Sequence, residues 1–314
     1  MMNANFSVLS AKATQPLVGI ELGGTKCICI LAFGPDELVA QEVVPTTDAE
    51  TTLGAIEQIL ARWWRTHGFR AMGIASMGPI RVDPKSPDYG HILATTKPGW
   101  PGADIAGRLS RPFGVPMAFD TDVNGAALAE MTWGAGRGLT DFAYVTVGTG
   151  VGVGLIVNGK PTRGIGHSEI GHIRVPRLPG DTAPSACCYH NDCVEGLASG
   201  TALKVRLGKQ NVSEIAADHF IWDVVTDAIT SMCHAMVCMT GPQRIVLGGG
   251  VMEKQPHILA RIEPALRHSL AGYIELPADE PYVRAPQLGN MAGPLGPIAM
   301  ALALEVEREA VGAM

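Results

Sequence analysis

Four side chains that bind soft and borderline metals lie within one short part of this 314-residue sequence. Cys187, His190 and Cys193 follow a C-x2-H-x2-C spacing, and His172 lies upstream in a glycine-flanked EIGH turn. Thiolates and imidazoles are the ligands of closed, four-coordinate zinc sites. The spacing therefore predicts a structural Zn²⁺. Cys188 can replace Cys187 as a ligand, although the C-x2-H spacing favours Cys187.

Two carboxylates accompany these ligands. Glu169 precedes His172 by three residues, and Glu195 follows Cys193 by two. A metal ion that fixes the ligands also fixes both acids beside it, where they can accept hydrogen bonds from a polyol. The alternative is a zinc knuckle with solvated acids, but such a knuckle does not require a histidine from a distant turn. A zinc hydrolase is excluded because four protein ligands leave no position for water.

A second group of acids follows a predicted strand. Residues 115–135 predict a short strand that ends in Asp120, Thr121 and Asp122, followed by an alanine-rich helix. An acid between a strand and a helix N-terminus lies at the edge of a cleft. Asp122 is therefore the candidate general base, with Asn124 as a nearby amide. Either aspartate can also cap the helix, but one carboxylate is enough for a cap.

Two stretches, 17–33 and 142–158, share a pattern of two apolar strands joined by a glycine turn, which predicts a β-hairpin. The turns contain Gly23, Gly24, Thr25 and Lys26 in the first stretch and Gly148, Thr149 and Gly150 in the second. Bare backbone N–H groups in such turns can approach phosphate oxygens. A single copy fits an ordinary turn equally well. The repetition predicts a duplicated sheet lobe with a phosphate chain held between the turns.

The remaining elements follow from periodicity and turn residues. A third glycine turn after the strand expected over 244–247 allows a flat ring to approach the backbone, so Gly249 and Gly250 are candidates for adenosine binding; the alternative is a plain tight turn. Helices are predicted over 48–67 and 212–239. The loop over 76–100 is long enough to form a wall or lid over a substrate.

Composition limits the class of protein. Hydrophobic residues make up 46% of the chain and charged residues 17%, which is typical of a compact enzyme. The net charge of −6 argues against a nucleic-acid partner. Seven cysteines, mostly in apolar runs, argue against a disulfide framework and indicate a reducing cytoplasm. The first 16 residues lack the features of a signal peptide, and no apolar run is long enough to cross a membrane.

In order, these motifs resemble those of the ROK family of sugar kinases, and most closely its bacterial fructokinase branch. The resemblance covers residues 17–304. It rests on GIELGGTK at 19–26, SMGPI, SPDYG and TKPGW within 76–100, FDTDVNGAALAE at 119–130, TVGTGVGVG at 146–154, the stretch over 163–200 that contains the four metal ligands, and RIVLGGGVM at 244–252.

The resemblance implies an α/β fold with two ribonuclease-H-like lobes of the actin/hexokinase-like ATPase fold around a central cleft. We expect a mobile tail over 1–16, a small lobe over 17–121 and a large lobe over 122–298 with a zinc-binding insertion over 164–200. The C-terminal helix, 299–314, is expected to pack on the small lobe. Family members are usually dimeric, so a homodimer is expected.

The resemblance also assigns roles to individual residues. Asp122 matches the catalytic base, and the glycine turns match the phosphate and adenosine loops for ATP and Mg²⁺. Residues matched to sugar binding are Gly78, Thr121, Asn124, Glu169, His172 and Glu195. Zinc is matched to His172, Cys187, His190 and Cys193.

Three positions depart from the family pattern. Thr121 replaces the asparagine of glucokinase-type members, and Glu21 stands where many relatives have aspartate near the metal-bound phosphates. The usual GDNAG motif is replaced by residues 289–293, GNMAG, which lack the acid.

The implied activity is ATP-dependent phosphorylation of D-fructose at its 6-hydroxyl. The alternatives are a kinase for mannose, glucose or an N-acetylhexosamine, and a non-catalytic ROK-type sugar sensor. A ROK repressor needs a DNA-binding module of ~60–80 residues ahead of the lobes, and the first hairpin begins too early for one. The presence of Asp122 favours a kinase over a sensor.

Overall fold

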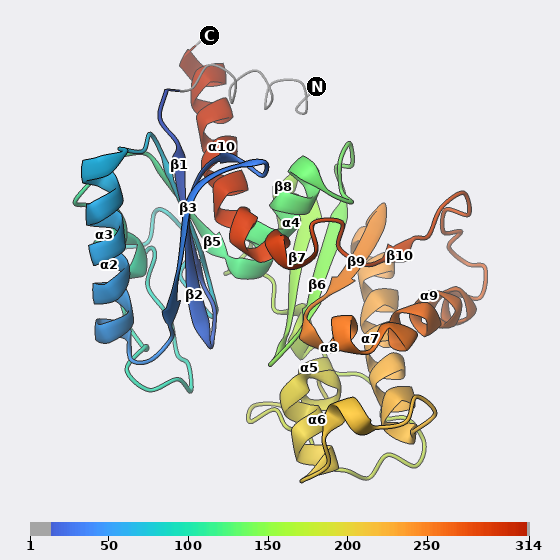
Figure 1. Cartoon of the computed structure of the whole chain (residues 1–314). Helices are drawn as coiled ribbons and strands as arrows, with labels where there is room; N and C mark the ends of the chain where they lie inside the picture. Colours follow the sequence, from blue (N-terminus) through green and yellow to red (C-terminus); the bar gives the residue numbers. More distant parts are fainter. Residues whose placement is uncertain (1–13, 313–314) are drawn as a thin grey trace. The chain divides into compact units, whose positions relative to one another are not determined.

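The computed structural model describes residues 14–312, which form two compact units. The first unit comprises the described residues up to Gly138, the segment Thr162–His167 and the residues from Asn290 onward. The second comprises Leu139–Pro161 and Ser168–Gly289. Each unit has one five-stranded sheet, flanking helices and its own apolar core (Figure 1).

The sheet of the first unit has the strand order β3-β2-β1-β4-β5. Its strands are β1 (Leu17–Leu22), β2 (Lys26–Gly34), β3 (Glu37–Pro45), β4 (Met72–Ser76) and β5 (Met117–Thr121). The first three strands form an antiparallel meander, whereas β4 and β5 continue the sheet in parallel with β1.

The sheet of the second unit repeats this order as β8-β7-β6-β9-β10, again with three antiparallel strands followed by two parallel ones. Its strands are β6 (Phe142–Val147), β7 (Val151–Val157), β8 (Lys160–Pro161), β9 (Arg244–Gly248) and β10 (Val283–Arg284). The predicted duplication is therefore present, and its two glycine turns occupy equivalent β1–β2 and β6–β7 connections.

Both faces of the first sheet are covered, because successive strand residues point to opposite sides. Val18 and Ile20 belong to the core that includes the apolar face of α2 (Ala49–Thr66). Leu17 belongs to a second cluster with Ile298 of α10 (Ala292–Gly312). α2 begins where expected, since Asp48 Oδ1 accepts a hydrogen bond from the Thr51 backbone N–H at 2.9 Å.

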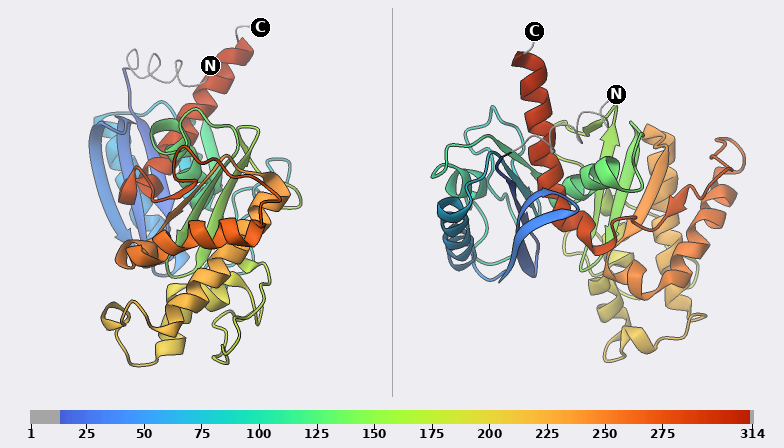
Figure 2. Two further views of the ribbon diagram at one scale, coloured as in Figure 1. Left: turned by 90° about the vertical axis from the view of Figure 1, so that its right-hand side faces the viewer. Right: turned by 45° about the horizontal axis from the view of Figure 1, so that its top comes forward.

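The other helices of the first unit are α3 (Ile105–Ser110) and α4 (Asp122–Trp133). α10 packs along α4 and the sheet (Figure 2). The two helices approach closely because glycines face each other: a Cβ on Gly296 would lie 2.6 Å from the Gly125 carbonyl carbon.

The second unit contains the short 3₁₀ turn η1 (Ile170–His172) and six further helical segments. They are α5 (Val194–Ala198), α6 (Gly200–Leu207), the 3₁₀ turn η2 (Val212–Glu214), α7 (Phe220–Thr240), α8 (Gly250–Lys254) and α9 (Pro256–Leu270). η3 (Gly289–Met291) leads into α10.

The helix predicted over 212–239 is wrong in its first part, because α7 begins only at Phe220. His219 caps it, its Nδ1 accepting from the Ile221 N–H at 3.1 Å. Ahead of it, Asn211 Oδ1 accepts from the Ser213 N–H at 3.2 Å, which makes a local turn. Side chains that bond to nearby backbone in this way compete with a continuous helix.

The compact units differ in extent from the predicted lobes. The first unit extends to Gly138 rather than to Thr121, because α4 packs against α10. It also contains Thr162–His167, where the sequence analysis places the start of the zinc insertion. Of the tail expected over 1–16, residues 1–13 lie outside the described residues.

Candidate active site

The strand-to-helix switch from β5 to α4 presents Asp122 as the first residue of the helix. Thr121 caps α4, because its hydroxyl accepts a hydrogen bond from the Asn124 N–H at 3.2 Å. The alternative in which Asp122 serves as the helix cap is therefore not what the structure shows. Asp122 is partly buried, and its Oδ1 accepts from the Val123 N–H at 2.9 Å. Its carboxylate is positioned by the helix start without serving as the cap.

The two neighbours of Asp122 that were assigned to sugar binding are almost fully buried. Thr121 is 4% exposed and uses its hydroxyl in the cap. Asn124 is 1% exposed and donates from Nδ2 to Asp120 Oδ1 at 2.9 Å. The Asn124 Oδ1 atom is buried without a hydrogen-bond partner. Gly78, the third of these candidates in the first unit, is exposed.

Asp120 and Arg163 form an ion pair that the sequence alone does not predict. Arg163 Nη2 donates to Asp120 Oδ2 at 2.6 Å, and Arg163 Nη1 donates to the Val82 carbonyl at 3.2 Å. The Asp120 side chain is only 4% exposed. A buried acid needs a partner, but the sequence alone shows neither that Asp120 is buried nor that Arg163 is its cation.

Glu21 lies at the end of β1, close to Asp122. Burial raises the pKa of Glu21 to about 7, repulsion from Asp122 adds to the rise, and Lys26 opposes it. A Cβ on Gly293 would collide with Glu21 Oε1, so the start of α10 packs directly on this acid. Two carboxylates and the first glycine turn therefore lie together in the first unit.

The glycines of the two turns differ in what the chain requires of them. A Cβ on Gly23 would lie 2.8 Å from the Lys26 carbonyl oxygen, so this position needs glycine for packing. Gly24 and Gly148 have open space around a Cβ and no positive φ. Neither packing nor backbone conformation requires glycine at these two positions. Both positions therefore leave open space beside the backbone.

Side chains and backbone hold the first turn in place. The Gly23 N–H donates to the Lys26 carbonyl at 3.1 Å, and Thr46 Oγ1 donates to the Gly23 carbonyl at 2.8 Å. Gly24, Thr25 and Lys26 are exposed. The exposed side of the turn is therefore presented by a fixed backbone.

The third glycine turn contains one structural and one open glycine. Gly249 has φ +89°, and its Cβ would lie 2.7 Å from the Val147 N and O atoms. Gly250 begins α8, is exposed, and has no atom within 4 Å of a Cβ. Gly250 is therefore the position where a ligand can approach the backbone.

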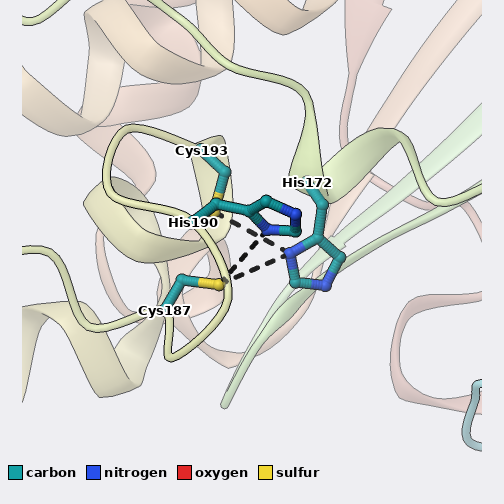
Figure 3. A group of neighbouring side chains, drawn as sticks. All are labelled: His172, Cys187, His190 and Cys193. Atoms are coloured by element: carbon teal, nitrogen blue, oxygen red, sulfur yellow. Dashed lines mark hydrogen bonds between the residues drawn. The ribbon is translucent and has the colours of Figure 1, made fainter.

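The four predicted metal ligands lie together in the second unit (Figure 3), with all four ligand atoms within 4.8 Å of one another. Cys187 Sγ lies 3.6 Å from His190 Nδ1 and 3.7 Å from His172 Nδ1, and Cys193 Sγ lies 3.8 Å from His172 Nδ1. Cys188 is exposed and does not belong to the group.

These separations fit zinc. A tetrahedral ion bound at ~2.0–2.1 Å to nitrogen and ~2.3 Å to sulfur gives ligand–ligand edges of roughly 3.4–3.8 Å. Two imidazoles and two thiols are also a common donor set of structural zinc sites. The chain therefore supplies a ligand set that matches the ion in type, and three cysteine–histidine separations of 3.6–3.8 Å match the edges of such a tetrahedron.

The acids assigned to sugar binding lie near His172 in different ways. His172 Nε2, the nitrogen that faces away from the cysteines, lies 3.8 Å from Glu195 Oε1. Glu195 Oε2 accepts from the Val151 N–H at 3.1 Å. Glu169 is exposed, and its carbonyl accepts from the His172 N–H at 3.0 Å.

An ion-pair network that the sequence alone does not predict holds residues 173–193, the segment between η1 and α5 that we call the metal loop. Arg177 Nε lies 2.7 Å from Asp192, and Arg177 Nη1 lies 3.2 Å from Asp181. Asp181 also pairs with Arg206 of α6 at 2.7 Å, and both of these side chains are almost fully buried. The network fastens the segment that carries His190 and Cys193 to α6.

Comparison with known proteins gives the class and then the family. A ROK hexokinase from Thermus thermophilus has a crystal structure that matches with a TM-score of 0.75 at 30% identity, covering 94% of this chain and 100% of that chain. The fold is thus the actin/hexokinase-like ATPase fold of sugar kinases. The ROK family model matches residues 17–304. The chain therefore belongs to the ROK family.

Two curated relatives match over almost their full length. A fructokinase from Zymomonas mobilis subsp. mobilis is 41% identical over 290 residues, 91% of this chain and 96% of the relative. A fructokinase from Pediococcus pentosaceus is 38% identical over 287 residues, 91% of this chain and 98% of the relative. Among residues 14–312, no helix is both long and apolar enough to cross a membrane.

Proposed function

We propose that the protein is an ATP-dependent fructokinase that forms fructose 6-phosphate. The observation that carries the proposal is the position of Asp122 as the first residue of α4, with Thr121 as the cap, in a chain that is 41% identical to a fructokinase. Phosphoryl transfer requires a positioned base and groups that neutralise phosphate charge. Asp122 and the glycine turns supply candidates for both.

In this proposal Asp122 accepts the proton of the 6-hydroxyl as that oxygen attacks the γ-phosphorus of ATP. The bond between the γ-phosphorus and the bridging oxygen breaks, and ADP leaves with that oxygen. The start of α4 holds the Asp122 carboxylate through the Val123 N–H. This fixed geometry supports a role as general base.

The nucleotide binds through backbone N–H groups of the two glycine turns. Gly24 and Gly148 support this assignment because the chain itself requires glycine at neither position. Lys26 and Thr25 add a charge and a hydroxyl to the first turn, and Gly150, Thr149 and the Gly249–Gly250 turn complete the set in the second unit. Mg²⁺ bound with ATP offsets charge on the transferred group.

We assign sugar recognition to polar groups in both units. Glu169, His172 and Glu195 are the candidates of the second unit, and Thr121, Asn124 and Gly78 those of the first. Because Thr121 and Asn124 are almost fully buried, their contribution is to shape the β5–α4 switch.

His172, Cys187, His190 and Cys193 would hold zinc, which supplies fixed geometry and takes no part in bond making. His172 can ligate through Nδ1 and keep Nε2 for Glu195 or a sugar hydroxyl. The role is therefore structural. A homodimer and a cytoplasmic location remain predictions of the resemblance and the composition.

The test compares kcat/KM for fructose, mannose, glucose and N-acetylated hexosamines with Mg·ATP under one set of conditions. Fructose should lead the series, and phosphoglucose isomerase should accept the product, which identifies the 6-phosphate. If glucose or an N-acetyl sugar leads, the enzyme is a different hexose kinase. If sugar binds but no hexose releases ADP, the protein is a sugar sensor.

A further inference from the structure

The metal ligands and the second glycine turn are joined by a short series of direct contacts within the second unit. Glu195 provides the first connection. Its Oε1 lies 3.8 Å from His172 Nε2, and its Oε2 accepts from the N–H of Val151, the residue that follows the turn. A Cβ on Gly150 would collide with the same oxygen, so Glu195 packs directly on the turn.

A second connection runs through α5 and α6. Cys193 caps α5, its Sγ accepting from the Gly196 N–H at 3.3 Å. Ser199 both ends α5 and caps α6, its Oγ accepting from the Ala202 N–H at 3.1 Å. The short helix α5 thereby connects the metal ligand Cys193 to the start of α6.

The start of α6 then binds the turn itself. The Gly200 N–H donates to the Gly148 carbonyl at 2.7 Å. Thr201 donates to the Thr149 carbonyl from its N–H at 3.2 Å and from its Oγ1 at 2.8 Å. The Gly148 and Thr149 carbonyls are therefore held by α6.

Holding these carbonyls also sets the direction of the neighbouring N–H groups. In a trans peptide the carbonyl and the following N–H point to opposite sides. With the Gly148 and Thr149 carbonyls directed at α6, the N–H groups of Thr149 and Gly150 point away from it. Those are the donors that a phosphate would contact.

We propose that the metal site positions the nucleotide-binding turn: occupancy of the four ligands tightens nucleotide binding at Gly148–Gly150 through Glu195 and through Ser199, Gly200 and Thr201. This inference rests on the proposed function, since it takes the turn to bind nucleotide. Glu195 and Thr201 are positioning residues, because they act on phosphate through the turn.

The experiment measures binding of Mg·ADP to the full chain by calorimetry, in the absence of sugar. Zinc-loaded protein is compared with protein stripped by chelation, and folding of both is checked by circular dichroism. Removal of the metal should weaken ADP binding about tenfold, the effect expected when a ligand must order its own site. Coupling is reciprocal, so saturating ADP should raise zinc affinity in a chelator competition by the same factor.

A pair of variants tests the route without disturbing the ligands. Thr201→Val removes the hydroxyl donor at constant shape, and Thr201→Ser keeps it. The valine variant should retain one zinc per chain and bind ADP several-fold more weakly, whereas the serine variant should bind like the original chain. ADP binding that is unchanged in folded metal-free protein, or in Thr201→Val, overturns the proposal.

Hydrogen exchange separates failure of this inference from failure of the proposed function, because it needs no nucleotide. Metal removal should accelerate exchange across residues 148–151 and leave the C-terminal half of α9 unchanged. If zinc-loaded protein does not bind ADP at all, the proposed function is wrong, and the exchange result alone decides whether metal and turn are coupled. Equal exchange at the turn with and without metal rejects the coupling.

Discussion

Arg163 and Asp120 form a charge-assisted hydrogen bond of 2.6 Å two residues ahead of the proposed base. Asp120 also accepts from the Thr121 N–H at 2.8 Å and from Asn124 Nδ2. Its carboxylate is thus engaged on several sides and organises the β5–α4 switch. The proposed role of Asp122 as general base does not require Asp120.

Removing Arg163 should destabilise the first unit. Arg163→Ala leaves a buried carboxylate without its cation, which we expect to lower the free energy of unfolding by about 1–3 kcal/mol. The double variant Arg163→Met/Asp120→Asn should recover most of that loss, because no unpaired charge remains. Urea denaturation gives both values.

The matched control is Arg62→Ala, which removes an ion pair between Arg62 and Glu42. The side chains of these two residues are 48% and 39% exposed, respectively. An exposed pair contributes about 0–1 kcal/mol. Equal losses in the two alanine variants would show that Asp120 does not depend on Arg163.

Replacement of the proposed base should affect turnover far more than binding. Asp122→Asn keeps the size of the side chain and the hydrogen bond to the Val123 N–H, so the fold and fructose binding should persist. Turnover should fall by about 10²–10⁴-fold. Asp48→Asn is the control, since asparagine also caps helices. Near-normal turnover in Asp122→Asn would assign the base to another acid.

Strand patterns and glycine turns predicted much of this structure because they depend on local sequence. The hairpins at 17–33 and 142–158 and the start of α2 have short-range causes, namely alternating apolar residues, a tight turn and the Asp48 cap. The same local logic failed over 212–219, where Asn211 and His219 make competing side-chain bonds that apolar periodicity does not reveal.

Contacts between residues far apart in sequence were not predictable in the same way. The four ligands could be grouped because their chemistry is distinctive, and the C-x2-H spacing selected Cys187 over its neighbour. Arg163 carries no such signal, because arginine is common on surfaces, and its partner is 43 residues away. The capping role of Thr121 was missed because Asp122 beside it is an equally good cap by type.

Stability should depend on pH through Glu21. Its pKa is about 7 in the folded chain against an ordinary value of 4.5, so between these pH values the folded state binds more protons than the unfolded state. Stability therefore falls as pH rises from about 4.5 to 7, and the full cost, of the order of 3 kcal/mol, is present above pH 7.

Glu21→Gln removes this cost. Without nucleotide or Mg²⁺, the variant should be more stable than the original chain at pH 8, with the advantage shrinking towards pH 5. Glu37→Gln, an exposed position at the start of β3, serves as the control. A difference between Glu21→Gln and the original chain that is the same at both pH values would contradict the assignment.

Metal content should distinguish two adjacent cysteines. Purified protein should carry about one zinc per chain, and strong chelation should lower its melting temperature, because metal bound only by the folded chain contributes to folding free energy.

Cys187→Ser should lose the metal, since Cys187 Sγ lies 3.6–3.7 Å from two ligand nitrogens. Cys188→Ser should keep it, because that exposed thiol is outside the ligand group. Zinc content by atomic absorption and the melting temperature are measured for both variants. Loss of zinc in Cys188→Ser with retention in Cys187→Ser would make Cys188 the ligand in place of Cys187.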